Sequence, residues 1–208
     1  MRYSDTQRES TSLHKLRLDK VVATLLGSGA ETVLDLGCGP GELLVRLASE
    51  PQFKRIVGMD TSLETLGAAR QRLGLVSDGS SASRICLWQA SFTSCVAEFA
   101  GFDAAVLLET IEHVEPSRLS AVEHAVFTEY HPRLVLLTTP NFEYNQLHGL
   151  RPGALRHRDH RFEWTRAKFQ SWSEGVARRN GYQVVFDAIG PVDARRGSST
   201  QMATFTRE

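Results

Sequence analysis

The chain lacks net charge, because its 24 lysines and arginines are balanced by 24 aspartates and glutamates over 208 residues. This balance argues against a protein that coats nucleic acid through a broad basic surface, and against an acidic disordered tail. No apolar run approaches the roughly 20 residues that a membrane-spanning helix needs, and the polar opening MRYSDTQRES does not fit a signal peptide. We therefore expect a single cytoplasmic domain over residues 1–208, with residues 1–12 as a disordered tail and no membrane partner.

Cysteine is also scarce, with three residues and no CxxC pair. An odd number without such a pair indicates neither a disulfide framework nor a zinc knuckle. We expect Cys38, Cys86 and Cys95 to be small buried or semi-buried thiols.

What the sequence does contain is an alternation of strand-like and helical stretches. Apolar runs predict strands at residues 32–36, 55–59, 85–89, 104–108 and 134–138, with two further runs at 182–189 and 200–206. Helical patterns occupy residues 13–26, 41–49, 62–73, 118–129 and 165–180. Short connections between alternating strands and helices predict right-handed crossovers and a parallel sheet, and hence an α/β fold. Residues 77–83 are expected to be a surface loop, and residues 139–164, which lack a clear period, an active-site loop.

The first predicted strand leads into the glycine-rich sequence VLDLGCGPG at residues 33–41. Gly37 and Gly39 permit a tight turn and let a ligand approach the backbone, although dinucleotide-binding folds use a similar loop. Asp35 lies two residues before the first glycine, where its charge opposes an anionic pyrophosphate and favours the cationic sulfonium of S-adenosylmethionine. The loop therefore favours the methyl donor over NAD.

Two more residues fit an adenosine ligand. Asp60 ends the second strand, where an acidic residue holds ribose hydroxyls in either cofactor class. Ser91 follows the third strand, at the place of an adenine contact. The structural alternative is that Asp35 caps the glycine loop and that Asp60 caps the helix starting near Ser62.

The fourth strand ends in the sequence ETIEH, which contains Glu109, Glu112 and His113. In a helical turn, positions i, i+3 and i+4 share one face, so these side chains are expected to converge. Two carboxylates and an imidazole suit Mg²⁺ or Mn²⁺ better than structural zinc. The alternative is a solvated helix face, but the carboxyl edge of a parallel sheet is where ligands bind. Three histidines of the 139–164 loop are candidates for a fourth ligand: His148, His157 and His160.

The same loop concentrates basic and aromatic side chains. Three arginines are expected either to be solvated or to contact phosphate: Arg156, Arg158 and Arg161. Phe162 and Trp164 either stack on bases or anchor the loop in the core, and we favour the anchoring role.

Three segments together resemble the small-RNA 3′-terminal ribose 2′-O-methyltransferase family. They are VLDLGCGPGELL with GMDTS, LLETIEHVEP, and TTPNFEYN followed by LRHRDHRFEWTRAKFQSW. The resemblance implies a Rossmann-like class I S-adenosylmethionine-dependent methyltransferase with a seven-stranded, mostly parallel sheet and helices on both faces. It also implies a metal held by two glutamates and two histidines, which match Glu109, Glu112, His113 and His160. His160 is preferred because the family's histidine lies in a D-H-x-F-E-W string, which leaves His157 near the site or facing RNA.

The family also implies an activity. Methyl transfer from S-adenosylmethionine to the 2′-OH of the 3′-terminal nucleotide of RNA is expected, assisted by Mg²⁺ or Mn²⁺ bound to the 2′ and 3′ hydroxyls. The expected cofactor-binding residues are Asp35, Gly37, Gly39, Asp60 and Ser91, although relatives often have glycine where this chain has Ala90. Small-RNA or RNA-repair proteins are the expected partners. The alternatives are a metal-dependent O-methyltransferase of a small diol or catechol, a non-catalytic RNA-binding module and an NAD-linked oxidoreductase.

The zero net charge conceals segregation along the chain. Residues 86–130 contain seven acids and one base, whereas residues 151–170 contain six bases and two acids. An acidic metal segment beside a basic loop is what binding a cation and one RNA end requires, and such binding weakens with salt.

Overall fold

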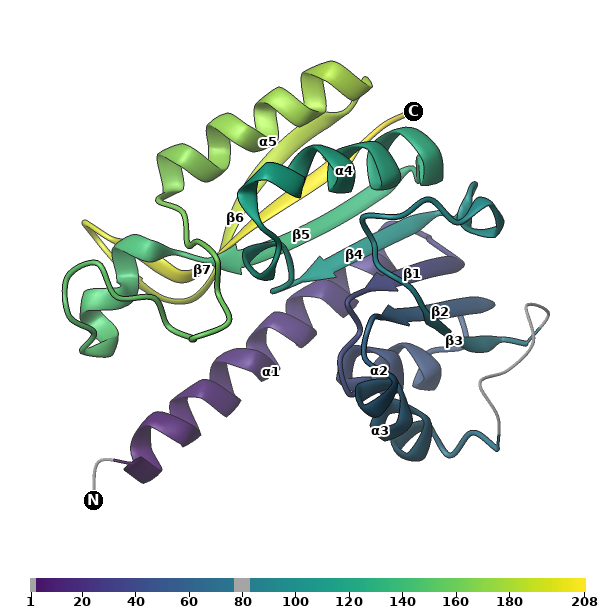
Figure 1. The fold of residues 1–208 in the computed structure, drawn as a ribbon, viewed down its shortest axis with the longest axis horizontal. Coiled ribbons are helices and arrows are strands. Elements are labelled where there is room, and N and C mark those ends of the chain that lie inside the picture. The colour runs from purple at the N-terminus through teal and green to yellow at the C-terminus, as the bar shows by residue number, and fades with distance from the viewer. Residues whose placement is uncertain (1–2, 77–82) are drawn as a thin grey trace.

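The computed structural model describes residues 3–76 and 83–208, and their side chains from Ser12 onward. The predicted surface loop at 77–83 therefore lies almost entirely outside the described residues. One seven-stranded sheet forms the centre of the molecule, in the order β3-β2-β1-β4-β5-β7-β6 (Figure 1). The strands are β1 (Thr32–Leu36), β2 (Arg55–Asp60), β3 (Ile85–Gln89), β4 (Ala104–Leu108), β5 (Leu134–Pro140), β6 (Gln183–Asp193) and β7 (Gly197–Thr206). Strands β1 to β5 are parallel, and β7 runs antiparallel to β5 and β6, which confirms the predicted α/β fold.

Helices cover both faces of this sheet (Figure 1). The helices are α1 (Tyr3–Gly27), α2 (Glu42–Ser49), α3 (Leu63–Leu73), α4 (Leu119–Glu123) and α5 (Arg166–Asn180). Leu25, Leu44 and Leu66 of the first three helices pack in one hydrophobic core. Phe127 and Phe169 belong to a second core on the opposite face. Each face of the sheet is therefore buried by its own set of helices, as buried parallel strands require.

Short helical turns connect the main elements. The 3₁₀ turns are η1 (Ala97–Phe99), η2 (Ile111–His113), η3 (Pro116–Arg118) and η5 (Phe142–His148), and η4 (His124–Tyr130) is a π-helix. Side-chain caps start two of the α-helices: Ser62 accepts from the Thr65 amide at 3.2 Å, and Thr165 accepts from the Lys168 amide at 3.3 Å. These caps explain why the predicted starts of α3 and α5 lie within one residue of the observed ones.

Four sequence expectations need correction. Helix α1 begins at Tyr3, so residues 3–12 are helical where a disordered tail was expected. The helix predicted at 118–129 is a short α4 that continues as the π-helix η4. The long loop is more ordered than expected, because β5 extends through Pro140 and η5 follows it. Cys38 and Cys86 are buried as expected, but Cys95 is exposed, and none of the three is in a disulfide.

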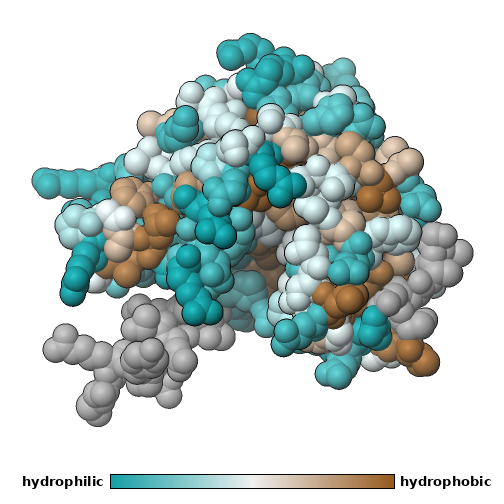
Figure 2. Space-filling view, viewed as in Figure 1, coloured by the Kyte–Doolittle hydropathy of each residue, from teal (hydrophilic) through white to brown (hydrophobic). Residues whose placement is uncertain are grey.

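On the face drawn in Figure 2, hydrophobic residues are scattered among hydrophilic ones. Within the described ranges, no helix combines the length and apolar character needed to cross a membrane.

Candidate functional site

The glycine loop after β1 is held in a conformation that needs glycine. Gly37, Gly39 and Gly41 all have positive φ angles, of 83°, 53° and 81°. A Cβ atom on Gly37 would lie only 2.6 Å from Cγ2 of Thr110, so both the backbone angle and the available space exclude a side chain there. The Gly37 amide donates to the Met59 carbonyl at 2.8 Å, which anchors the loop to β2. The first strand therefore ends in a rigid turn that exposes backbone to the space above the sheet.

A cavity of about 660 Å³ opens beside this turn. Its lining includes all five residues expected to bind the cofactor: Asp35, Gly37, Gly39, Asp60 and Ser91. Glu109 and His113 line the same cavity. Its size suits a small-molecule ligand. The glycine loop and the ETIEH turn thus face one shared space.

Asp35 lies buried at the base of the cavity, with 2% of its surface exposed. Its Oδ2 atom has no hydrogen-bond partner among the described residues. Burial, and secondly the charge of Asp60, raise the pKa of Asp35 to about 7. This unpaired oxygen caps no backbone group, and a cation placed beside it would relieve the cost of the buried charge.

Asp60 does not cap α3, as the alternative expected, because Ser62 is the cap; Asp60 instead holds the glycine loop and the residue that precedes the helix. Its Oδ2 accepts from the Gly39 amide at 3.1 Å, and its Oδ1 accepts from the Ser62 amide at 2.9 Å. Each carboxylate oxygen can accept a second hydrogen bond, so this role leaves Asp60 able to bind hydroxyl groups from the cavity. Ser91 lies at the cavity wall, with its hydroxyl 2.7 Å from that of Thr93.

The ETIEH turn differs from the expected helical turn. Glu109 has a positive φ of 53°, and the helical part is only the 3₁₀ turn Ile111–His113. The expected helical turn through Glu109 is therefore wrong, although Glu109 still lies near Glu112, whose pKa its charge raises. The Glu109 carboxylate instead pairs with Arg17 of α1, its Oε2 lying 2.8 Å from Nη2. Its amide donates to the Thr138 carbonyl at 3.2 Å, which ties this strained residue to β5.

Glu112 and His113 meet His160 from the long loop. One ligand atom from each of these three residues lies within 4.8 Å of those of the others. Glu112 is fully buried, and its Oε2 accepts from the Thr139 hydroxyl at 3.0 Å. Its Oε1 finds no partner within the described part of the chain, and burial, followed by the charge of Glu109, raises its pKa well above the usual range. A buried carboxylate with a bare oxygen beside two imidazoles fits a divalent cation.

The histidines are arranged unequally around this cluster. The rings of His113 and His160 are 4.9 Å apart between centroids, and burial, followed by the charge of His160, lowers the pKa of His113. His157 is largely exposed, 6.4 Å from the His113 ring between centroids. His148 is occupied elsewhere, since its Nε2 lies 2.8 Å from the Ser199 hydroxyl. The structure thus brings His160, and not His148, to the Glu112 carboxylate.

The basic and aromatic residues of the loop take different roles. Arg156 is neither solvated nor free for phosphate, because its guanidinium is enclosed by bonds to Asn145, Ser199 and the Asn141 carbonyl. Both expectations for Arg156 were therefore wrong.

Two other arginines remain at the surface. Arg158 is exposed, and Arg161 lines the cavity, with Nε 3.2 Å from Oε1 of Glu115. Phe162 is buried and stacks on Trp164 at 4.4 Å between ring centroids, which confirms that these rings anchor the loop.

Comparison with known proteins places this geometry in a family. A model described as a methyltransferase domain matches residues 33–129. A crystal structure of the methyltransferase domain of bacterial CtHen1-CN is 42% identical, with a TM-score of 0.83, and the match covers 94% of this chain and 100% of that one. The small RNA 2′-O-methyltransferase of Arabidopsis thaliana is 30% identical over 94% of this chain. The chain belongs to the small-RNA 2′-O-methyltransferase family.

Membership of this family confirms the resemblance seen in the motifs, and the fold is that of S-adenosylmethionine-dependent methyltransferases. The chain spans 23% of the length of the Arabidopsis relative. A chain from the Pnkp1/Rnl/Hen1 RNA repair complex, 21% identical with a TM-score of 0.66, shares the fold; the match covers 94% of this chain and 42% of that one.

Three supporting residues of this methyltransferase domain were not expected from sequence. Glu163 contacts His160, Thr139 contacts Glu112, and Arg17 contacts Glu109. The contact of Glu163 with His160 could have been predicted from sequence, because Glu163 lies three residues after His160 in the same D-H-x-F-E-W string. Arg17 had none, since it lies on α1, remote in sequence from Glu109.

Proposed function

We propose that this chain transfers the methyl group of S-adenosylmethionine to the 2′-oxygen of the 3′-terminal ribose of RNA. The observation that carries the proposal is the junction of two sites. The cavity that contains the glycine loop and Asp35 is also lined by Glu109 and His113, and His113 meets Glu112 and His160. A methyl donor and a metal-bound hydroxyl acceptor would lie side by side there.

The cofactor would be held by acidic side chains and by the backbone of the glycine loop. The unpaired, buried Oδ2 of Asp35 favours a ligand that carries positive charge, as the sulfonium and amine of S-adenosylmethionine do. The carboxylate of Asp60 would accept hydrogen bonds from ribose hydroxyls, and Ser91 would contact the adenine end. Positive-φ glycines let this ligand lie against the loop.

Four side chains would hold Mg²⁺ or Mn²⁺: Glu109, Glu112, His113 and His160. Oε1 of Glu112 and Oε1 of Glu109 are buried and have no hydrogen-bond partner among the described residues, and this is the observation that fits them to a cation. When bound, the ion would act as a Lewis acid that lowers the pKa of the 2′-hydroxyl and orients it. To bind the metal, the Glu109 carboxylate would either contact the ion and Arg17 together or break its ion pair with Arg17.

The chemical step would form the bond from the 2′-oxygen to the methyl carbon and break the bond from sulfur to that carbon. The products are the 2′-O-methyl ether, S-adenosylhomocysteine and the proton of the hydroxyl. Holding the methyl donor and the acceptor oxygen in line would supply much of the rate enhancement of this methyl transfer. Burial lowers the pKa of His113, which favours the neutral imidazole that a metal ligand or proton acceptor needs.

Arg161 lines the cavity and would give up its ion pair with Glu115 to contact a phosphate of the terminal nucleotides. The metal would bind the 2′ and 3′ hydroxyls together. Only a 3′-terminal nucleotide presents both hydroxyls free, so the enzyme would act at the end of the RNA.

Partner proteins of RNA-repair or small-RNA pathways, and a cytoplasmic location, belong to the same proposal.

The test uses labelled S-adenosylmethionine with Mn²⁺ or Mg²⁺ and three RNAs of one sequence. They end in a 2′,3′-diol, in 2′-deoxyribose, or in a 3′-phosphate. Label is expected on the diol RNA alone, and chelation of the metal should abolish it. Equal transfer to the other ends would refute the proposal, and transfer to a catechol in place of RNA would favour the small-diol alternative.

A further inference from the structure

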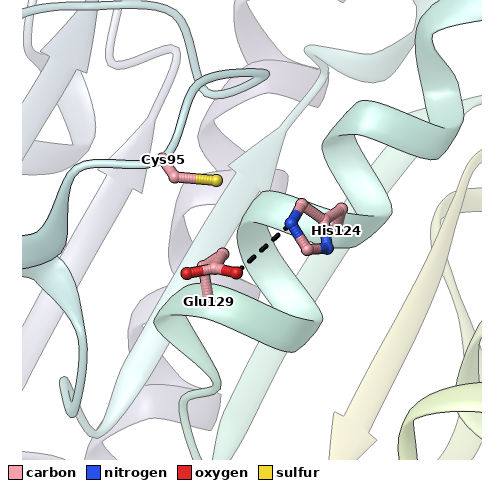
Figure 3. A group of neighbouring side chains, drawn as sticks. All are labelled: Cys95, His124 and Glu129. Atoms are coloured by element: carbon pink, nitrogen blue, oxygen red, sulfur yellow. Dashed lines mark ion pairs between the residues drawn. The ribbon is translucent and has the colours of Figure 1, made fainter.

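A second group of potential metal ligands lies on the surface, outside the proposed active site. Cys95, His124 and Glu129 are all exposed, and one ligand atom of each lies within 4.8 Å of those of the others. Figure 3 shows the Cys95 side chain pointing from its loop towards the helical segment that carries the other two. The group differs from the proposed catalytic cluster in containing a thiol.

The π-helix η4 explains why His124 and Glu129 are neighbours. In an α-helix, residues five apart lie about 140° from one another around the axis. In a π-helix, pairing from i to i+5 places such residues one turn apart on one side. The His131 amide accordingly bonds to the Val126 carbonyl at 3.1 Å, and Nε2 of His124 lies 3.2 Å from Oε1 of Glu129. Single π turns of this kind are often found at functional sites.

The Cys95 loop is fixed on both sides of the cysteine. Before it, the Ser94 carbonyl accepts from the Tyr130 hydroxyl at 2.7 Å, and Tyr130 itself belongs to η4. After it, Phe99 is buried and packs edge-on against Tyr130, with ring centroids 5.9 Å apart. The thiol is therefore held over η4 before any ligand arrives, which reduces the entropic cost of binding.

We propose that Cys95, His124 and Glu129 bind a borderline-soft divalent cation of the zinc class. Thiolate, imidazole and carboxylate are the donor set of zinc, and three protein ligands leave a fourth position for water. Bond lengths of about 2.0–2.1 Å with tetrahedral angles separate a nitrogen and an oxygen ligand by about 3.3–3.4 Å. The 3.2 Å between His124 and Glu129 matches that separation. Binding releases the thiol proton to solvent and uses the neutral imidazole.

Cobalt(II) is a suitable probe, because it binds zinc sites and absorbs in the near ultraviolet when a thiolate is a ligand. Titration of the whole protein with Co²⁺ should produce this thiolate band, and Zn²⁺ should remove it by displacement. Cys95→Ser should abolish the band, and His124→Gln should weaken binding by about tenfold or more. Because all three side chains are exposed, these variants should melt at the temperature of the unmodified protein.

Two controls separate this site from the rest of the molecule. Cys86→Ala removes a buried thiol and Glu112→Gln disables the proposed catalytic cluster, and both should keep the thiolate band. A protein without a thiolate band would overturn the proposal and leave His124 and Glu129 as a surface ion pair. An undiminished band in Cys95→Ser would overturn it as well. The result is independent of methyl transfer, so the two proposals can fail separately.

Discussion

Nδ1 of His160 lies 2.5 Å from Oε1 of Glu163, a buried carboxylate of the same long loop. Burial by itself raises the pKa of Glu163, but hydrogen bonds from His160, Asn145 and the Arg156 amide outweigh it and lower the pKa. An ionised Glu163 favours the proton on Nδ1, which would make Nε2 the ligand atom of His160 in the proposed metal site. Such carboxylate–histidine pairs fix ring orientation and raise ligand basicity at metal sites.

Replacement of Glu163 should therefore weaken metal binding without changing any ligand. Glu163→Gln is expected to lower Mn²⁺ affinity by about 10- to 100-fold. Electron paramagnetic resonance of free Mn²⁺ measures this without RNA. Glu143→Gln is a matched control in the same loop, because Glu143 pairs with Arg166 at 2.7 Å. Unchanged Mn²⁺ affinity in Glu163→Gln would contradict the role assigned to this carboxylate.

Arg17 should compete with the metal for Glu109. Arg17→Met leaves the largely buried Glu109 carboxylate unpaired near Glu112, which should destabilise the metal-free protein by about 2 kcal/mol or more. Mn²⁺ should then raise the melting temperature more than it does in the unmodified protein. Lys15→Met removes an exposed pair on the same helix and should change stability by less than about 1 kcal/mol. A variant that responds to Mn²⁺ like the unmodified protein would exclude this competition.

The buried Asp35 should make stability fall as pH rises. Its pKa is raised to about 7, so between about pH 4 and 7 the folded protein keeps a proton that the unfolded chain has lost. This carboxyl group therefore stabilises the fold most at low pH and costs up to about 4 kcal/mol once pH exceeds 7. Asp35→Asn should flatten that slope in urea unfolding measured from pH 5 to about 8.

The same ionisation should govern cofactor choice. The ionised carboxylate attracts a sulfonium more than a thioether, so the preference for S-adenosylmethionine over S-adenosylhomocysteine should grow as Asp35 loses its proton. Calorimetry at about pH 6 and 8 measures both affinities. A preference that is independent of pH, or that persists unchanged in Asp35→Asn, would argue against contact between Asp35 and the sulfonium.

Two glycine substitutions should have opposite effects. Gly37→Ala combines a φ of 83° with a contact of 2.6 Å to Thr110, so we expect a loss of about 2–4 kcal/mol in the free energy of unfolding, together with weaker cofactor binding. Gly67→Ala lies within α3, where the new Cβ would meet no atom within 4 Å apart from its chain neighbours and the backbone of its own helix, and should gain about 0.5–1 kcal/mol. Urea unfolding measures both changes, and a tolerated alanine at residue 37 would contradict the close packing of the loop.

The sequence by itself determined the order of elements and much of their extent. The apolar runs at 32–36, 85–89 and 104–108 coincide with β1, β3 and β4. They could be predicted because buried parallel strands are short, continuous apolar segments between polar turns. The glycine loop and the family of the protein could also be predicted, because each is recognised from motifs of residues that lie close together in the chain.

Only the tertiary structure decided which distant side chains meet. Arg17 reaches Glu109 because α1 packs against the sheet, and Arg156 is buried because the loop folds over β7. Cys95 joins His124 and Glu129 because a π turn interrupts the expected helix. Local sequence patterns fix periodicity and turn chemistry, but a contact across many residues depends on how whole elements dock. The ion pairs around the proposed metal ligands are products of that docking.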